Sequence, residues 1–188
     1  MQFLRDDNCI VLDFLPKGHS TGRQEPIAQI LGNKYFSLLE VIIKRDVNLK
    51  NGDIIYIGEG KREQVDHIKR RITVRELTTF ARSELPFVVE RLVKEDEQRF
   101  VDFFNKAQPI STRLHQLELL PGVGKKHMWD IIEERKSNGP FKNFEDIKHR
   151  IKLMPDPLNT IVKRIMEELE NENVRYRLFV SGPQRRFP

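Results

Sequence analysis

Short apolar runs separated by turn residues occupy the first sixty positions, and this pattern predicts β-strands. β-branched and aromatic residues are enriched in four runs, at positions 10–12, 27–31, 35–44 and 54–57. The dipeptide Gly32-Asn33 lies between two of these runs and is typical of a hairpin. Four or five short strands in so few residues predict a small curled sheet or barrel, because closure removes exposed strand edges.

The apolar spacing becomes helical after residue 72. Thr73 and Glu76 have the spacing of a capping box, and Pro86 suits the first position of a helix that continues to about residue 106. The stretch 64–71, just before them, fits a strand and a helix equally well. The residues after the sheet therefore predict a helical connector.

Residues 111–170 predict four short helices joined by tight turns. Leu114 and Leu117 are expected to face inward on the first of these helices. Turn and capping residues mark the helix boundaries, at 120–124, Gly139-Pro140, Asn143 and Asp156-Pro157.

Strand periodicity returns near the end of the chain. Apolar and basic residues alternate over 174–180, which predicts a strand. A lone strand is not stable, so we expect it to pair with the N-terminal sheet. Residues 181–188 carry Arg185 and Arg186 and are expected to form a mobile basic tail.

The charge balance favours a polyanionic partner. The 188 residues include 33 Lys and Arg against 28 Asp and Glu, a formal net charge of +5. A single cysteine, Cys9, excludes a disulfide framework, and the five histidines do not have metal-ligand spacing. The chain lacks both a long apolar run and a signal-peptide pattern, so we expect a cytoplasmic protein with no metal, no cofactor and no membrane partner.

The sequence LPGVGKK at 120–126 is a helix-hairpin-helix signature. Gly122 and Gly124 are expected to supply unusual backbone angles and close access to the main chain, while Val123 points into the helix pair. The N–H groups that open the next helix have no partners inside it, and Lys125 and Lys126 add positive charge there. This pattern predicts a site for a nucleic-acid phosphate. A tight hairpin that only packs helices or docks a protein is the alternative.

An internal repeat accompanies this motif at an offset of 34 positions, since Pro155 matches Pro121 (155 − 121 = 34). At that offset Gly122 is replaced by Asp156 and Gly124 by Leu158. A carboxylate repels phosphate, and leucine blocks close approach. We therefore expect one functional hairpin and one structural hairpin, in which Asp156 can also act as a helix N-cap.

Two basic clusters could extend a binding surface, although clustered charges are more often a solvated face. The first contains Lys61, Arg62, Lys69, Arg70, Arg71 and Arg75, and the second contains Arg175, Arg177, Arg185 and Arg186. Three aromatic residues of the predicted strands could stack on bases or fill the core, namely Tyr35, Phe36 and Tyr56.

The whole chain resembles an uncharacterised archaeal family of proteins regarded as RNA-binding. Residues 107–126 and 144–147 carry the resemblance. It implies an N-terminal barrel of the oligonucleotide-binding (OB) type, a tandem helix-hairpin-helix domain and a preference for RNA. Residues 138–146 also resemble the link within tandem hairpins of DNA-uptake and repair proteins.

An enzymatic function is not expected. Helix-hairpin-helix DNA glycosylases carry a catalytic lysine where Lys126 lies, and Asp146 is the nearest candidate for their aspartate. The helices needed to enclose a flipped base are missing, however, because the front third of the chain is predicted to be β. Cys9 has no evident histidine partner.

Together these features predict an α+β protein with four segments. They are an OB-like barrel at 1–72, a helical connector at 73–109, a tandem helix-hairpin-helix domain at 110–172, and a strand plus basic tail at 173–188. The expected function is non-catalytic RNA binding in translation or RNA maturation, with ribosomal or RNA-processing components as possible partners. The alternatives are a DNA repair or replication accessory that binds duplex DNA, and a protein-docking module.

Overall fold

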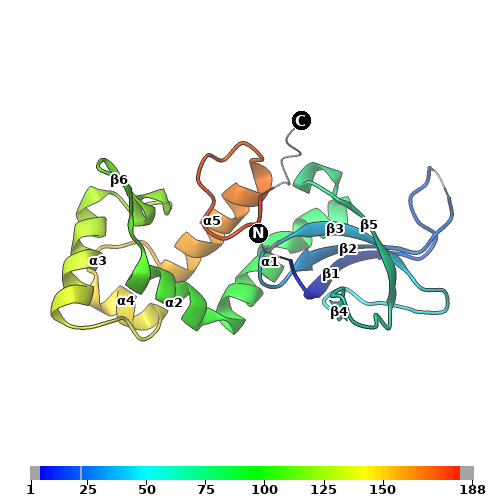
Figure 1. The fold of residues 1–188 in the computed structure, drawn as a ribbon, viewed down its shortest axis with the longest axis horizontal. Coiled ribbons are helices and arrows are strands. Elements are labelled where there is room, and N and C mark those ends of the chain that lie inside the picture. Colours follow the sequence, from blue (N-terminus) through cyan, green and yellow to red (C-terminus); the bar gives the residue numbers. More distant parts are fainter. Residues whose placement is uncertain (1–4, 22, 183–188) are drawn as a thin grey trace. The chain divides into compact units, whose positions relative to one another are not determined.

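Residues 5–21 and 23–182 are described by a computed structural model, in which the chain forms two compact units (Figure 1). The first unit comprises residues 1–88 and 168–188, and the second comprises 89–167. The chain therefore passes from the first unit to the second within α1 (Thr79–Glu95) and returns within α5 (Pro157–Glu170).

The first unit is built on a curled five-stranded antiparallel sheet, a half-barrel. Its strands are β1 (Asn8–Leu15), β2 (Ile27–Gly32), β3 (Leu38–Ile43), β4 (Ile54–Tyr56) and β5 (Val65–Arg71), in the order β4-β1-β2-β3-β5. Alternate apolar residues of these strands fill the concave side, among them Val11, Ile30, Val41, Ile55 and Val65. The expected strands and the hairpin after Gly32 are confirmed, because β2 pairs with β3.

The structure decides two points that the sequence left open. The sheet is curled as expected, but the ladders among the described residues leave β4 and β5 as edges, so it is a half-barrel and not a closed barrel. The ambiguous stretch 64–71 is a strand, since β5 pairs with β3.

The connector also differs from expectation. Thr73 and Glu76 are bonded as expected, with the Thr73 N–H donating to the Glu76 carboxylate at 2.8 Å, but they frame only a 3₁₀ turn, Val74–Glu76. Pro86 lies inside α1 instead of at its start, and the helix breaks at Asp96 before α2 (Glu97–Lys106). Helix α1 begins instead after Thr78, whose hydroxyl accepts the N–H of Ala81 at 3.0 Å.

The expected strand at 174–180 is wrong. Three successive N–H groups, those of Leu178, Phe179 and Val180, donate to the buried carboxylate of Glu168 at 2.7–3.0 Å. Extended backbone alternates in direction from residue to residue, so three consecutive donors cannot converge on one carboxylate in a strand. The segment nevertheless returns to the turn between β2 and β3, because the Ser181 N–H donates to the Tyr35 carbonyl at 3.0 Å. The tail residues Arg185 and Arg186 lie outside the described residues.

The second unit is mainly helical. Besides α2 and parts of α1 and α5, it contains β6 (Pro109–Ser111), β7 (Leu114–His115), a 3₁₀ turn (Gln116–Leu119), α3 (Lys125–Ser137) and α4 (Phe144–Arg150). Its core is formed by side chains from each helix, including Phe100, Phe104, Leu117, Ile131, Ile147, Ile161 and Ile165.

The first expected hairpin helix is wrong, while the three later helices are confirmed. Leu114 lies in a short strand, and only the 3₁₀ turn precedes the LPGVG loop. His115 fixes that turn, because its Nδ1 accepts the Leu117 N–H at 3.1 Å and its own N–H donates to Glu118 at 2.9 Å. Over 5–21 and 23–182, no helix combines the length and apolar character needed to cross a membrane.

Candidate nucleic-acid interface

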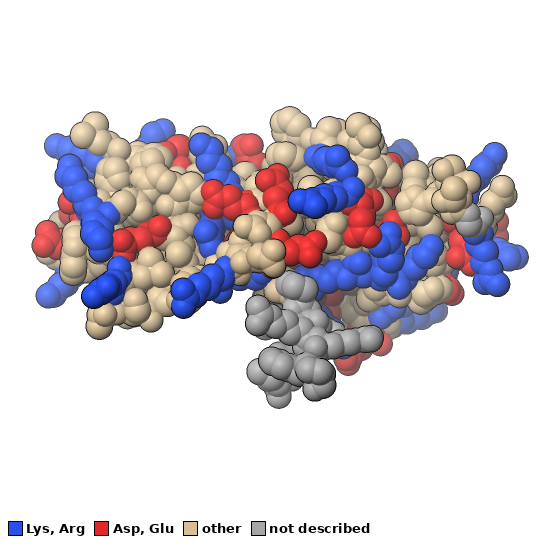
Figure 2. Space-filling view, turned by 90° about the horizontal axis from the view of Figure 1, so that it is seen from above, with Lys and Arg blue, Asp and Glu red and all other residues tan. Residues whose placement is uncertain are grey.

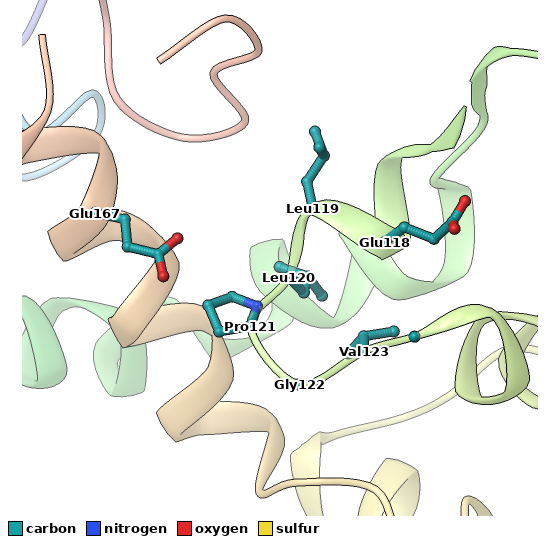
Figure 3. A pocket seen from close by; sticks show the side chains of 8 residues that line it. Glu118, Leu119, Leu120, Pro121, Gly122, Val123 and Glu167 are labelled. Carbon is teal, nitrogen blue, oxygen red and sulfur yellow. The ribbon is translucent and has the colours of Figure 1, made fainter. Parts of the chain in front are cut away.

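The loop at 120–124 joins the 3₁₀ turn to α3 and is anchored by apolar residues. Leu120 and Val123 are both buried, and the Val123 N–H donates to the Leu120 carbonyl at 3.0 Å. Val123 therefore holds the turn against the helices as the sequence predicted. Gly122, which is labelled in Figure 3, and Gly124 are both exposed.

The fold requires a glycine at position 122 but not at position 124. Gly122 has a φ of +79°, and a Cβ there would lie 2.7 Å from the Cγ of Pro155, so both its conformation and its surroundings require glycine. Gly124 has φ −89° and ψ −173°, which any residue adopts, and a Cβ there would meet nothing within 4 Å. The prediction of unusual backbone angles is thus right for Gly122 and wrong for Gly124.

Helix α3 begins without a side-chain cap. Gly124 occupies its N-cap position and offers no side-chain acceptor to the first turn. The other two helices that begin in this unit after a loop are capped: Asn143 accepts the Asp146 N–H at 2.7 Å, and Asp156 accepts the Asn159 N–H at 3.0 Å. The start of α3 is therefore where an external anion could take the place of a cap.

Charges of both signs surround this helix start. An open hollow of about 490 Å³ lies along the loop, and Glu118 and Glu167 line it. In Figure 3 the Glu167 side chain points toward the loop, whereas the Glu118 side chain points away from Glu167. Lys125 Nζ lies 3.5 Å from Glu118 Oε1, and an Arg164 nitrogen lies 3.6 Å from Glu167 Oε2. An incoming phosphate would have to compete with Glu118 for Lys125.

Glu118 and Glu167 were missed by the sequence analysis. Glu118 follows His115 by three positions, the spacing of a capping box, so its place at the loop could have been predicted. Glu167 comes from α5, and only the tertiary packing of this unit brings it to the loop.

The loop before α5, at 153–156, is occupied by structural contacts. Asp156 caps α5, and its carboxylate lies 3.7 Å from Lys148 Nζ. Helix α5 then starts with Pro157, which has no N–H to offer. Pro155, which precedes Asp156, packs against Gly122 of the loop at 120–124. The predicted N-cap role of Asp156 is confirmed.

The first basic cluster lies in the first unit and is largely engaged within the protein. Arg70 Nε donates to the buried Glu40 at 2.9 Å, and its guanidinium also bonds Glu76, which raises the pKa of Arg70. Arg71 donates to Ser181 Oγ at 3.0 Å. Lys69 is exposed. In Figure 2, basic and acidic side chains are interspersed on the visible face instead of forming one basic band.

The second basic cluster likewise contains both a residue engaged within the protein and an exposed one. Arg177 donates to the carbonyls of Glu168, Asn171 and Glu172 at 2.7–3.2 Å, and so it caps the C-terminal end of α5. Arg175 is exposed, with its guanidinium 5.1 Å from the centre of the Tyr176 ring. Lys61 and Arg75 of the first cluster are exposed as well, like Lys69 and Arg175.

The aromatic candidates on the sheet mostly serve the fold. Phe36 is fully buried, and the half-buried Tyr56 uses its hydroxyl to accept the Gly60 N–H at 3.1 Å. Tyr35 is half-buried. Trp129, an aromatic residue that was not predicted from the sequence, lies exposed on α3. Met128 and Ile131 are buried, so Trp129 lies on the outer face of this helix.

Of the residues considered for catalysis, Asp146 is held in structural contacts, Cys9 is buried and Lys126 is exposed. Asp146 accepts the Lys142 N–H at 2.9 Å, which lowers its pKa, and it also pairs with Arg150. Burial raises the pKa of the Cys9 thiol. Within the described ranges, no three histidine, cysteine, aspartate or glutamate side chains come together where they could hold a metal ion.

Comparison with known proteins gives consistent matches over nearly the whole chain. A family profile described as "Protein of unknown function (DUF655)" matches residues 5–181. The uncharacterised protein MJ0038 of Methanocaldococcus jannaschii is 48% identical over 172 residues, which cover 91% of this chain and 78% of that protein. The crystal structure of Af1531 from Archaeoglobus fulgidus, also described by DUF655, matches with a TM-score of 0.84 and 48% identity, covering 94% of this chain and all (100%) of that one.

Proposed function

We propose a function for this chain, which belongs to the DUF655 family: it is a non-catalytic protein that binds nucleic acid at the loop before α3. Gly122 and Val123 shape the loop, Gly124 leaves its backbone accessible, and Lys125 and Lys126 supply positive charge. These contacts engage phosphate and do not read bases. The preference for RNA, in translation or RNA maturation, follows from the resemblance noted in the sequence.

Gly124 provides the observation that carries this proposal. The backbone conformation at this position suits any residue, and a Cβ would point into open space, so the fold alone does not require glycine. A glycine here does keep the first N–H groups of α3 open to an external group. A phosphate oxygen is a suitable partner, because it meets both the free N–H groups and the positive end of the helix dipole.

The wider architecture is also part of the proposal. We take the half-barrel to be related to OB barrels and the loops around Gly122 and Asp156 to be tandem helix-hairpin-helix turns, of which only the first binds. Lys69 and Arg175 would extend the contact, since their side chains are exposed.

A Gly124→Leu variant tests the proposal. Leucine stands at the matching position 158 of the repeat, and at 124 its side chain would cover the N–H groups without straining the loop. We expect affinity for nucleic acid to fall about tenfold or more, since one lost charge-assisted hydrogen bond is worth about 1.5–3 kcal/mol. The free energy of unfolding should fall by only about 1 kcal/mol, because leucine is a poorer N-cap residue than glycine. Fluorescence anisotropy with labelled single-stranded RNA, duplex RNA and duplex DNA of scrambled sequence, at several salt concentrations, measures this.

Asp156→Asn is the matched control at the second hairpin. Asparagine retains the N-cap bond to Asn159, so the variant should bind nearly as the wild type does. The nucleic acid that binds most tightly decides between RNA handling and a DNA repair accessory. Wild-type affinity in Gly124→Leu would contradict the phosphate site. If the wild type bound none of the three ligands, the loop would be better explained as a protein-docking element.

Charge changes at the same loop should act in opposite directions. Lys125→Gln is expected to weaken binding about equally for all sequences and to reduce the slope of log affinity against log salt by about 1. Glu118→Gln keeps an acceptor for the His115 N–H but removes the charge that holds Lys125, so binding should tighten about two- to fivefold. The same anisotropy titration measures both variants, and a sequence-dependent effect of Lys125→Gln would refute a backbone contact.

A further inference from the structure

Trp129 is a large apolar side chain that the fold leaves in solvent. Trp129 lies in α3 with an exposed fraction of 58%, and it is the single tryptophan of the chain. Met128 and Ile131 on the same helix are buried and form its inward face. The packing of α3 therefore does not depend on the indole, and its exposure is unfavourable unless something covers it.

The indole lies close to the proposed phosphate site along the helix. The rise per residue of an α-helix is about 1.5 Å, so Trp129 lies about 6 Å, or roughly one turn, beyond Lys125 on the same face, and Lys126 is three positions before it. Glu133 follows four residues later and gives the next turn of this face the opposite charge. Lys125, Lys126 and Trp129 thus lie together in the first two turns of α3, and the other basic residues of the helix, Arg135 and Lys136, lie in its last turn.

Two lysines and one exposed aromatic ring at the start of α3 suit the phosphate and the base of a single nucleotide. We propose that Trp129 stacks on an unpaired base of the strand whose phosphate lies at the 120–124 loop, so that the site selects single-stranded nucleic acid over continuous duplex. The inference rests on the proposed function. Stacking tolerates any base, because every base has a π-face, whereas the faces of bases inside a duplex are already covered by their neighbours.

A protein partner fits these observations less well. Stable protein interfaces bury about 800 Å² on each side, and their central aromatic residues are surrounded by further packed groups. Among the described residues of the second unit, the exposed large hydrophobic side chains are Trp129 and Leu153, and of these only Trp129 lies on α3. One exposed ring beside two lysines has the chemistry of a base-stacking site.

The sole tryptophan makes the test direct, because selectively excited tryptophan fluorescence reports on Trp129 alone. We expect single-stranded RNA to quench this fluorescence with the same midpoint as the anisotropy titration. A duplex of equal length should bind through phosphate contacts without quenching. The probes are scrambled single-stranded and duplex oligonucleotides at low salt.

Variants at position 129 complete the experiment. Trp129→Leu should weaken single-strand binding about five- to hundredfold, leave duplex affinity unchanged and keep the urea midpoint, and Trp129→Phe should restore part of the loss. Phe87→Leu is the matched control, because Phe87 is also an exposed aromatic residue, on the part of α1 that belongs to the first unit.

The outcomes separate the two proposals. If the wild type shows no anisotropy change with any nucleic acid, the proposed function fails and the stacking role fails with it. If the wild type binds, but without quenching and with the same affinity as Trp129→Leu, only the stacking role is overturned. Equal quenching by single strand and duplex would overturn the selectivity for unpaired bases.

Discussion

Glu168→Ala is expected to lower the free energy of unfolding of the first unit by about 3–5 kcal/mol. The carboxylate accepts the N–H groups of Leu178, Phe179 and Val180, and the last two of these residues are buried. Removing the acceptor leaves up to three donors without a partner, and a buried unsatisfied group costs about 1–3 kcal/mol. Urea unfolding measures the loss, and hydrogen exchange at residues 178–180 locates it.

Two further variants make this prediction specific. Glu167→Ala removes the adjacent carboxylate, which is half exposed and paired with Arg164 at 3.6 Å, and should change stability by less than about 1 kcal/mol. Glu168→Gln keeps one acceptor oxygen but turns an NH₂ group toward the remaining donors, so its loss should be intermediate. Equal unfolding midpoints for Glu168→Ala and Glu167→Ala would show that the carboxylate does not hold the C-terminal segment.

Arg150→Ala should destabilise the second unit by about 2–4 kcal/mol. The guanidinium donates to the carbonyls of Glu134 and Gly139 at 3.2 and 2.9 Å, near the C-terminal end of α3. It also bonds the carboxylates of Glu134 and Asp146 and lies 4.4 Å from the centre of the Phe141 ring. Its loss leaves carbonyls and two carboxylates without their main donor. Urea unfolding checks this, with the exposed Arg113→Ala as the matched control.

The effect of Arg150→Ala should depend on pH. The hydrogen bond from Arg150 lowers the pKa of Glu134, and the Lys142 N–H together with Arg150 lowers that of Asp146. A carboxyl group with a lowered pKa in the folded state stabilises that state above its ordinary value, 4.5 for Glu134, and this contribution is lost as the pH falls through the lowered value. The difference between wild type and variant should therefore shrink below about pH 4. A pH-independent difference would assign the stability to the carbonyl contacts alone.

Helix boundaries marked by local capping residues could be predicted from the sequence. Asn143 caps α4, Gly139 follows α3 with a φ of +80°, and Pro157 opens α5. Each signal acts within a few residues, so tertiary packing does not overrule it. The expected helix through Leu114 and Leu117 failed because a spacing of three suits both a helix and a 3₁₀ turn.

Long-range contacts explain the other errors. The alternation at 174–180 is typical of a strand, but the Glu168 carboxylate imposes a different backbone on it. Arg70 is one of six basic residues in its cluster by sequence, whereas the fold pairs it with Glu40, thirty positions away. A sequence shows which charges are near each other along the chain, and only the fold shows which are already neutralised.

The candidate site also combines local features, which the sequence predicts, with contacts that only the fold creates. Gly122, Val123 and Lys125 could be assigned from the motif because their roles are local to the loop. The proximity of Pro155 to Gly122 and of Glu167 to the loop depends on how the second hairpin and α5 pack. The exposure of Trp129 could have been predicted from the helical period of α3, since residues 128 and 131 define its buried face.

The discontinuity of the first unit has a consequence for protein synthesis. Residues 89–167 are contiguous and leave the ribosome as one piece, so the second unit has all its residues before Glu168 has been added. The sheet of the first unit emerges earlier, but the Tyr35 carbonyl and the Arg71 guanidinium receive their partner Ser181 only after the second unit has been translated. The half-barrel is therefore translated before the second unit and completed after it.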